Sequence, residues 1–177
     1  MRDMAPGYRA TMFERLNTAE ELYHFKLGAA LKMEQTVLEM LDENANEAQD
    51  AKLAELFRHH QDETREQIQN LEKAFGLFGW EVDDSPCPAI QGIEKEGKAN
   101  ARKTDDALVD AVLLSGAAET EHHEIAVYEG LITFAQAMGK GEVVELLEHN
   151  LEQEKHTLEE VRNATYHIAA QKVGTPA

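Results

Sequence analysis

The segment AAETEHHEIAVYEGLITFA, residues 117–135, decides the fold class. It holds no proline and a single glycine, so little in it opposes a helix. In steps of three and four residues, Glu121 is followed by Glu124, Tyr128 and Leu131, which is the spacing of one helical face. The segment therefore predicts a long helix whose buried face carries two carboxyl groups.

The rest of the composition agrees with an all-helical domain. Of the 177 residues, 42% are hydrophobic, which is ordinary for one globular domain with its own core. The chain has only 11 glycines and 4 prolines, and several of them cluster within residues 76–97. Long stretches therefore lack a helix breaker, whereas a sheet would need frequent turns. We predict an all-α protein.

The charge of the chain limits its partners. Acidic residues outnumber basic ones by 34 to 17, which gives a formal net charge of −17. Such a surface repels phosphate backbones and anionic lipids. We therefore predict binding neither to nucleic acid nor to a membrane. An acidic surface keeps a helical protein soluble, and it also attracts cations.

No targeting or membrane segment is recognisable. Residues Met1 to Thr11 lack an apolar core of signal-peptide length. No run of about 18 apolar residues is present to span a bilayer. Cys87 is the only cysteine, which excludes an intramolecular disulfide and a cysteine-based metal site. We predict a cytoplasmic protein.

Apolar spacing, capping residues and breakers divide the chain into four long helices. The predicted helices run from Thr18 to about Glu43, from about Asp50 to Phe78, from Thr104–Asp106 to Met138, and from the Gly139–Gly141 turn to about Ala170. A short extra helix fits within Cys87–Asn100, on the outside of the bundle.

Two helical hairpins joined by one long connection predict a ferritin-like four-helix bundle, with one crossover that carries the short extra helix. The alternative is an up-down bundle with a decorated loop, and the sequence leaves both open. We assign residues 1–16 to a flexible N-terminal arm, 17–170 to the bundle and 171–177 to a frayed tail.

Ionisable residues interrupt the apolar face of every predicted helix. Six such residues are the candidate metal ligands, namely Glu34, His60, Glu63, Glu121, Glu124 and Glu154. A buried carboxylate costs several kcal/mol, and close carboxylates repel one another. The flanking Lys and Arg residues point mostly outward, so bound cations are the expected compensation. The competing interpretation is that some of these acids are partly exposed at the open ends of a bundle.

The heights of these residues along the bundle support a shared site. Glu34 lies about 11 residues before the first predicted turn and Glu63 about 13 after it, so both lie ~16–20 Å from that turn. Glu124 and Glu154 lie ~20 Å from the second turn by the same helical rise. Within each hairpin the acids therefore meet near the middle of the bundle.

The expected ligands favour certain metals over others. Oxygen-rich sites with one or two imidazoles suit iron or manganese and also accept zinc. We predict two divalent metal ions, iron first, with manganese or zinc as alternatives. Tyr128 either donates a hydrogen bond to a ligand or belongs to the core. The other histidines are expected at the surface or behind the ligands, namely His24, His59, His122, His123, His149, His156 and His167.

Several short motifs occur in an order and spacing that resemble one bacterial family. The motifs are Leu22-Tyr23 followed by Glu34; Phe57, His60, Glu63 and Thr64; Leu71-Glu72 and Phe75; Cys87, Ala89, Gly92-Ile93 and Glu96-Gly97; Glu121-His122, Glu124-Ile125-Ala126 and Tyr128; and Leu151, Glu154 and Lys155. Over about residues 17–161 the chain resembles the ferritin-like stress proteins typified by YciF and YciE. The resemblance implies a homodimer and a dinuclear metal site.

The leading hypothesis is a dinuclear metal-binding stress protein with ferroxidase, oxidase or peroxide-handling activity. In it, Glu34 and Glu121 or Glu124 are terminal ligands, Glu63 and Glu154 bridge the ions, and His60 is the nitrogen ligand. The second hypothesis is a non-catalytic helical dimer with a structural or vestigial metal site. A cage-forming iron store is less expected, because no cage contacts are recognisable.

One feature departs from common di-iron proteins, which carry a Glu-x-x-His motif on two helices. Glu66 and Thr157 stand three residues after Glu63 and Glu154, where histidines would be expected. We therefore expect a site rich in carboxylates and poor in histidine.

Overall fold

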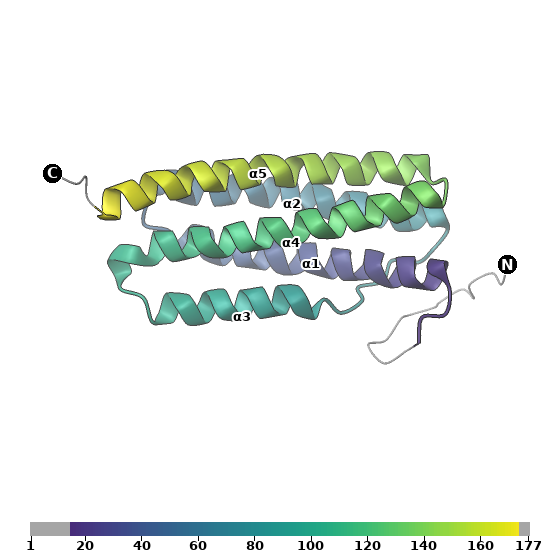
Figure 1. Ribbon diagram of the computed structural model, residues 1–177, viewed down its shortest axis with the longest axis horizontal. Helices are drawn as coiled ribbons and strands as arrows, with labels where there is room; N and C mark the ends of the chain where they lie inside the picture. The colour runs from purple at the N-terminus through teal and green to yellow at the C-terminus, as the bar shows by residue number, and fades with distance from the viewer. Residues whose placement is uncertain (1–14, 174–177) are drawn as a thin grey trace.

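The computed structural model describes residues 15–173, and every regular element in that range is helical (Figure 1). In chain order the elements are α1 (Ala19–Glu47), α2 (Ala51–Phe78), α3 (Pro88–Arg102), the 3-10 turn η1 (Asp106–Leu108), α4 (Val109–Ala137) and α5 (Gly141–Val173). The predicted arm falls almost entirely outside the described residues, as do the last four residues of the predicted tail.

Side-chain caps fix the starts of the first two helices as the sequence predicted. The hydroxyl of Thr18 accepts a hydrogen bond from the backbone N–H of Glu21 at 3.0 Å, and the Glu21 carboxylate accepts one from the N–H of Thr18 at 3.2 Å. This reciprocal pair satisfies two free donors at the helix end. The carboxylate of Asp50 caps α2 in a similar way. Helix α2 ends at Gly79, whose φ of 74° suits a residue without a side chain.

The ends of three helices differ from prediction. Helix α1 continues four residues beyond Glu43, because no breaker follows and Ala45 extends its buried face. Before α4, Asp105 caps the short turn η1, so the long helix starts only at Val109. Helix α5 reaches Val173, three residues beyond its predicted end.

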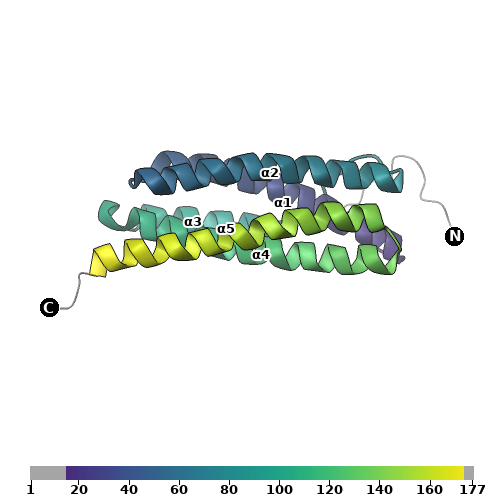
Figure 2. The same ribbon diagram turned by 90° about the horizontal axis from the view of Figure 1, so that it is seen from above.

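The chain path confirms the single crossover and excludes the up-down alternative. Helices α1 and α2 form one antiparallel hairpin, and α4 and α5 form the other. The connection through α3 returns along the length of the bundle, so α2 and α4 run in the same direction (Figures 1 and 2). Each long helix packs against two others, with α1 beside α4 and α2 beside α5. This connectivity is that of ferritin-like folds.

The crossover is held against the bundle at two places. Helix α3 packs on α4 and α1, and buries Ile90 completely. The loop before α3 presses its backbone onto Gly28 of α1, where Asp83 and Ser85 are both buried. A β-carbon at Gly28 would lie 2.8 Å from the carbonyl oxygen of Asp83 and 2.9 Å from the backbone nitrogen of Ser85.

We expect Gly28→Ala to destabilise the protein by about 2 kcal/mol, because the added methyl group meets backbone atoms that cannot move independently. Gly92→Ala is the matched control, since a β-carbon there meets no atom within 4 Å. The control is expected to leave stability unchanged or raise it by ~0.5 kcal/mol, because alanine restricts the unfolded chain. Urea unfolding of both variants checks this, and equal stability would contradict the close approach at Gly28.

The core follows the predicted helical faces. On α2 the series Phe57, His60, Thr64, Gln67 and Leu71 is buried throughout. Polar residues therefore lie within the same buried faces as the apolar ones, in the middle of the bundle. Between residues 15 and 173, no helix has the length and apolarity needed to cross a membrane.

Candidate metal centre

Each of the four long helices places ionisable side chains at the centre of the bundle. Glu34 comes from α1, His60 from α2, Glu121 and Glu124 from α4, and Glu154 from α5. All five residues are at most 2% exposed. They are buried because they occupy apolar-face positions of their helices, and the hairpins bring those positions to one level.

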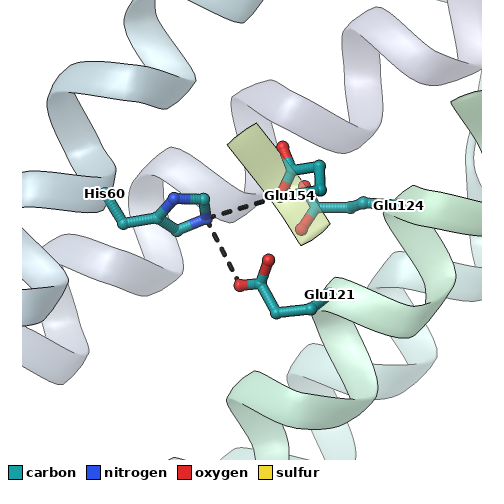
Figure 3. Close-up of side chains that lie close together, drawn as sticks. All are labelled: His60, Glu121, Glu124 and Glu154. Carbon is teal, nitrogen blue, oxygen red and sulfur yellow. Dashed lines mark ion pairs between the residues drawn. The ribbon is translucent and has the colours of Figure 1, made fainter. Parts of the chain in front are cut away.

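Four of these side chains converge on a common point (Figure 3). His60, Glu121, Glu124 and Glu154 each offer one ligand atom, and these atoms all lie within 4.8 Å of one another. The Nε2 atom of His60 lies 3.3 Å from Oε1 of Glu121 and 3.8 Å from Oε2 of Glu154. One imidazole nitrogen and three carboxylates can therefore surround a single cation.

Glu34 lies at the edge of this four-residue group rather than within it. Its Oε1 accepts a hydrogen bond from the hydroxyl of Tyr128 at 2.5 Å, and its carboxyl group is also linked to that of Glu124. The Oε2 atom of Glu34 is buried and has no hydrogen-bond partner. Glu34 and Glu124 thus provide oxygens on the α1 side, where a second ion would have to bind.

Glu63, the sixth predicted ligand, occupies an outer position. Its Oε2 lies 3.4 Å from Nδ1 of His60, on the ring edge opposite the carboxylates, and accepts a hydrogen bond from Thr157 at 3.3 Å. Its Oε1 lies 3.9 Å from Nε2 of His59. The side chain is 16% exposed. Glu63 therefore contacts the edge of the His60 ring that faces away from the other carboxylates, and it reaches solvent.

Burial and mutual repulsion raise the pKa values of three buried carboxyl groups and so favour their protonated forms. Burial raises the pKa of Glu34 to about 7, although the hydrogen bond from Tyr128 opposes this shift. Burial, followed by the charges of Glu154 and Glu34, raises the pKa of Glu124 well above its usual range. Burial also raises the pKa of Glu154, against the attraction of His60. Without a cation, this interior holds protons that the same carboxyl groups would lose in water.

The pKa of His60 is shifted in the direction opposite to the one that burial alone would cause. Burial alone would lower the pKa of His60, but the negative charges of Glu121, Glu63 and Glu154 outweigh it and raise that pKa well above the usual range. We call His60, Glu34, Glu121, Glu124 and Glu154 the cluster. Among the described residues, no Lys or Arg forms an ion pair with a carboxylate of the cluster. Bound protons or bound cations must therefore offset the charge of the buried carboxyl groups.

The unpartnered atoms fit a metal. The buried atoms without a hydrogen-bond partner include Oε2 of Glu34, Nε2 of His60, Oε2 of Glu121, and both carboxylate oxygens of Glu124 and of Glu154. Buried polar atoms are nearly always satisfied in proteins, so orphaned atoms that converge on one point are explained by shared protons, bound water or an ion. A set of several carboxylates with one imidazole suits divalent iron, manganese or zinc. The residues present therefore form a possible metal-binding site.

A neutral polar layer adjoins the cluster and was largely missed by sequence reasoning. Asn150 donates hydrogen bonds to the hydroxyl of Tyr128 at 3.0 Å and to the backbone oxygen of Gln67 at 3.3 Å, and accepts one from Asn70 at 2.8 Å. Both amide atoms of the buried Gln67 lack partners. Tyr128 thus joins this layer to Glu34. The sequence analysis anticipated only Tyr128, as a possible hydrogen-bond donor to a ligand, and Tyr128 does donate to the candidate ligand Glu34.

One histidine departs from expectation. His24 is buried, with its ring 5.0 Å from that of Trp80 and 5.5 Å from that of Phe75. It precedes Glu34 by ten residues, which is about 15 Å along α1, so it packs in the core instead of supporting the ligands. His24 lies three residues before the buried Leu27, which places it on the same helical face. His123 is half-buried, and the other non-cluster histidines are exposed.

With the fold and the site described, the comparisons with known proteins identify the family. The model of a family described as "Domain of unknown function (DUF892)" matches residues 18–174. The chain belongs to the DUF892 family. This agrees with the resemblance to YciF and YciE, and the name itself assigns no activity.

Members and structural relatives share both sequence and fold with this chain. Protein YciF of Escherichia coli strain K12 is 28% identical over 144 residues, which cover 80% of this chain and 87% of YciF. The crystal structure of that stress protein matches with a TM-score of 0.82 at 25% identity, covering 87% of this chain and 98% of that one. YcfI of Rhodopseudomonas palustris, provisionally described as a structural protein, matches with a TM-score of 0.81 at 30% identity, covering 85% and 97%.

A more distant relative extends the likeness of fold. A protein of Bacillus anthracis strain Ames, described as ferritin-like and diiron-carboxylate, matches with a TM-score of 0.67 at 17% identity. The match covers 85% of this chain and 99% of that protein. At this identity the likeness concerns the fold alone, and it confirms the ferritin-like bundle.

Proposed function

We propose that this DUF892 protein is a dinuclear metal-binding protein of the stress response, with oxidase, ferroxidase or peroxide-handling activity. The convergence of His60, Glu121, Glu124 and Glu154 on a point where their buried ligand atoms lack partners carries the proposal. The YciF relationship supports the assignment to stress physiology. The ferritin-like, diiron-carboxylate relative supports two ions, with iron as the first choice.

In this proposal the two ions have different surroundings. His60 and Glu121 would hold the first ion from α2 and α4, while Glu34 would hold the second from α1. Glu124 and Glu154 belong to the group around His60 and also lie within electrostatic reach of Glu34, so these two residues would contribute to holding both ions. Glu63 was predicted as a bridging ligand, but its contact with the far edge of His60 favours an outer role.

The surrounding residues would control the reactivity of such a centre. Iron or manganese would supply one-electron chemistry toward dioxygen or peroxide. Tyr128 holds one oxygen of Glu34, which leaves its other oxygen for an ion. Thr157 and Glu63 face Nδ1 of His60, so they orient the ring and direct Nε2 inward. Buried apolar neighbours such as Phe57 limit the entry of water.

The alternative is a structural bundle with a stabilising metal ion. The description of YcfI as a structural protein favours this second candidate. A stabilising site needs the same ligands but no redox turnover, because ions that bind only the folded state stabilise it by mass action. The two functions therefore differ in reactivity and not in metal binding.

Metal titration with activity assays tests the proposal. We expect the purified chain to bind two equivalents of Fe(II) or Mn(II), to unfold at a higher temperature when loaded, and to accelerate Fe(II) oxidation or peroxide loss. His60→Ala is the negative variant and exposed His156→Ala the matched control. Stabilisation without turnover would support the structural alternative, and absence of binding would refute both.

Two further predictions accompany the proposal. A homodimer remains expected from the family resemblance, and size-exclusion chromatography with light scattering measures it. The cytoplasmic location and the absence of nucleic-acid binding also remain predictions, which fractionation and gel-shift assays check.

A further inference from the structure

The five carboxylates predicted as metal ligands differ sharply in their contact with solvent. Glu34, Glu121, Glu124 and Glu154 are at most 2% exposed, so solvent cations cannot reach them directly. The side chain of Glu63 is 16% exposed and still touches His60. Among the carboxylates of the described residues that contact the cluster histidine, Glu63 is thus the one that also reaches solvent.

Glu63 faces two histidines with its two oxygens. One oxygen lies 3.4 Å from Nδ1 of the buried His60, and the other lies 3.9 Å from Nε2 of His59, whose side chain is 63% exposed. His59 and Glu63 are four residues apart on α2, so they lie on neighbouring turns of one helical face. We call these two residues the entry pair.

The geometry points to the entry pair as an outer cation site, from which a hydrated divalent ion passes to the buried centre. We propose that His59 and Glu63 capture the ion and that the Glu63 carboxylate delivers it past His60. This inference rests on the proposed function, because it needs a centre that binds metal. Glu63 would therefore bind an ion only while the ion passes to the centre. It need not bind the ions that occupy the centre.

The chemistry of the entry pair suits brief capture. One imidazole and one carboxylate give a cation two ligands, which is too few for tight binding but enough to displace part of its water shell. Thr157 donates only a long hydrogen bond of 3.3 Å to Glu63, which favours movement of the carboxylate.

Two surface hollows between the long helices lie away from the ligand residues of the candidate centre. The groove of about 680 Å³ between α2 and α5 is bordered by Glu66 and His149, and no cluster residue lines it. The cavity of about 280 Å³ between α1 and α4 is lined by Tyr23 and Phe134 among other residues, again without a cluster residue.

Stopped-flow loading of the full-length, metal-free chain with Co²⁺ tests the proposal, since the visible absorption of bound Co²⁺ reports its arrival. We expect Glu63→Gln to slow loading about tenfold, the lower end of what electrostatic capture adds to association rates. Glutamine keeps an oxygen that can accept a hydrogen bond from Nδ1 of His60, so the support of the ring should persist and the equilibrium affinity should change less than about threefold. Release to EDTA should therefore slow by nearly the same factor. His59→Ala should slow both steps about threefold, because it removes one of the two capture ligands.

Glu66→Gln is the matched control. Glu66 is an exposed carboxylate one turn further along α2 and also contacts a histidine, His149, at 3.4 Å. Loading rates of this variant should equal those of the unmodified protein. Far-ultraviolet circular dichroism of Glu63→Gln checks that the variant is folded, as expected for a conservative change at a partly buried position.

The possible outcomes separate this inference from the proposed function. Unchanged loading and release in Glu63→Gln would overturn the transit role while leaving the metal centre intact. A large loss of affinity with unchanged loading would make Glu63 a resident ligand, which also overturns the transit role but supports the centre. If the unmodified protein binds no Co²⁺, Fe²⁺ or Mn²⁺, both the proposed function and the entry pair are refuted.

Discussion

Glu124→Gln is expected to produce a more stable metal-free protein that no longer binds metal. Glu124 is completely buried, and burial together with Glu154, Glu34 and Glu121 raises its pKa well above the usual range. Folding therefore favours the protonated form of Glu124 relative to the unfolded chain. A glutamine of the same shape removes the cost of burying this carboxyl group, so the free energy of unfolding should rise by about 1–3 kcal/mol.

The same substitution removes two oxygens that lack any other partner. Changes that only disturb the support of a ligand weaken metal binding about 10–100-fold, so loss of a ligand should weaken it more than ~100-fold. Urea unfolding with EDTA and isothermal titration with Mn²⁺ measure the two effects. A variant that is less stable without metal, or that binds as tightly as before, would contradict the electrostatic description of the centre.

Glu129→Gln provides the matched control for this experiment. Glu129 lies on the same helix, five residues further along, but is exposed and pairs only with Lys155 at 3.5 Å. Exposed ion pairs contribute little to stability, so neither stability nor affinity should change measurably. The contrast between the two variants isolates the effect of burial on a carboxylate.

The stability of the metal-free protein is expected to fall as pH rises from about 4.5 to 7. Burial raises the pKa of Glu34 from 4.5 to about 7, so the folded state binds this proton more tightly than the unfolded chain does. The stabilisation is complete below the unfolded pKa and is lost as pH rises through the folded pKa. For Glu34 the loss is about 3 kcal/mol, and Glu124 and Glu154 act in the same direction.

Urea unfolding at pH 5 and pH 7.5 with EDTA measures this loss, and Glu34→Gln should reduce it. Saturating Mn²⁺ should abolish it, because the ions replace the protons and hold the carboxylates ionised. Glu63 acts in the opposite direction, since the hydrogen bond and charge of His60 outweigh its burial and lower its pKa. Comparison of the unmodified protein with Glu34→Gln therefore isolates the buried carboxyl. A metal-free protein that is more stable at pH 7.5 than at pH 5 would contradict the prediction.

Both experiments measure the free-energy cost of holding several carboxyl groups close together in the protein interior. In both, metal affinity is obtained at the expense of stability without metal, because like charges are held together before any ion arrives. The orphaned oxygens of Glu124 and Glu154 are therefore poorly explained by folding alone. They are well explained by a site that is completed by cations.

The buried positions of the candidate ligands could be predicted from the sequence because helical period is a local property. Glu121 and Glu124 lie between apolar residues in steps of three and four, and the structure buries both. Glu34 and Glu154 follow the same rule on α1 and α5. Heights counted from the turns then placed these residues near mid-bundle. Neither argument required knowledge of distant contacts.

The outer position of Glu63 could not be predicted in this way. It lies one step beside the buried His60–Thr64 face of α2, and a difference of one residue rotates a side chain by about 100° around the helix. Whether such a residue is buried depends on the neighbouring helix, here on Thr157 of α5. The polar layer around Asn150 was missed for the same reason, because its partners lie on α2 and α4.

The sequence by itself determined that this chain is all-helical, where its helices lie to within a few residues, and which acids lie on buried faces. These properties follow from local spacing, capping and breakers. Only the tertiary structure decided which oxygens converge around His60, that Glu34 belongs with Tyr128, and that Glu63 faces both His59 and solvent. Those relations depend on how four helices rotate and pack against one another, which no single helix encodes.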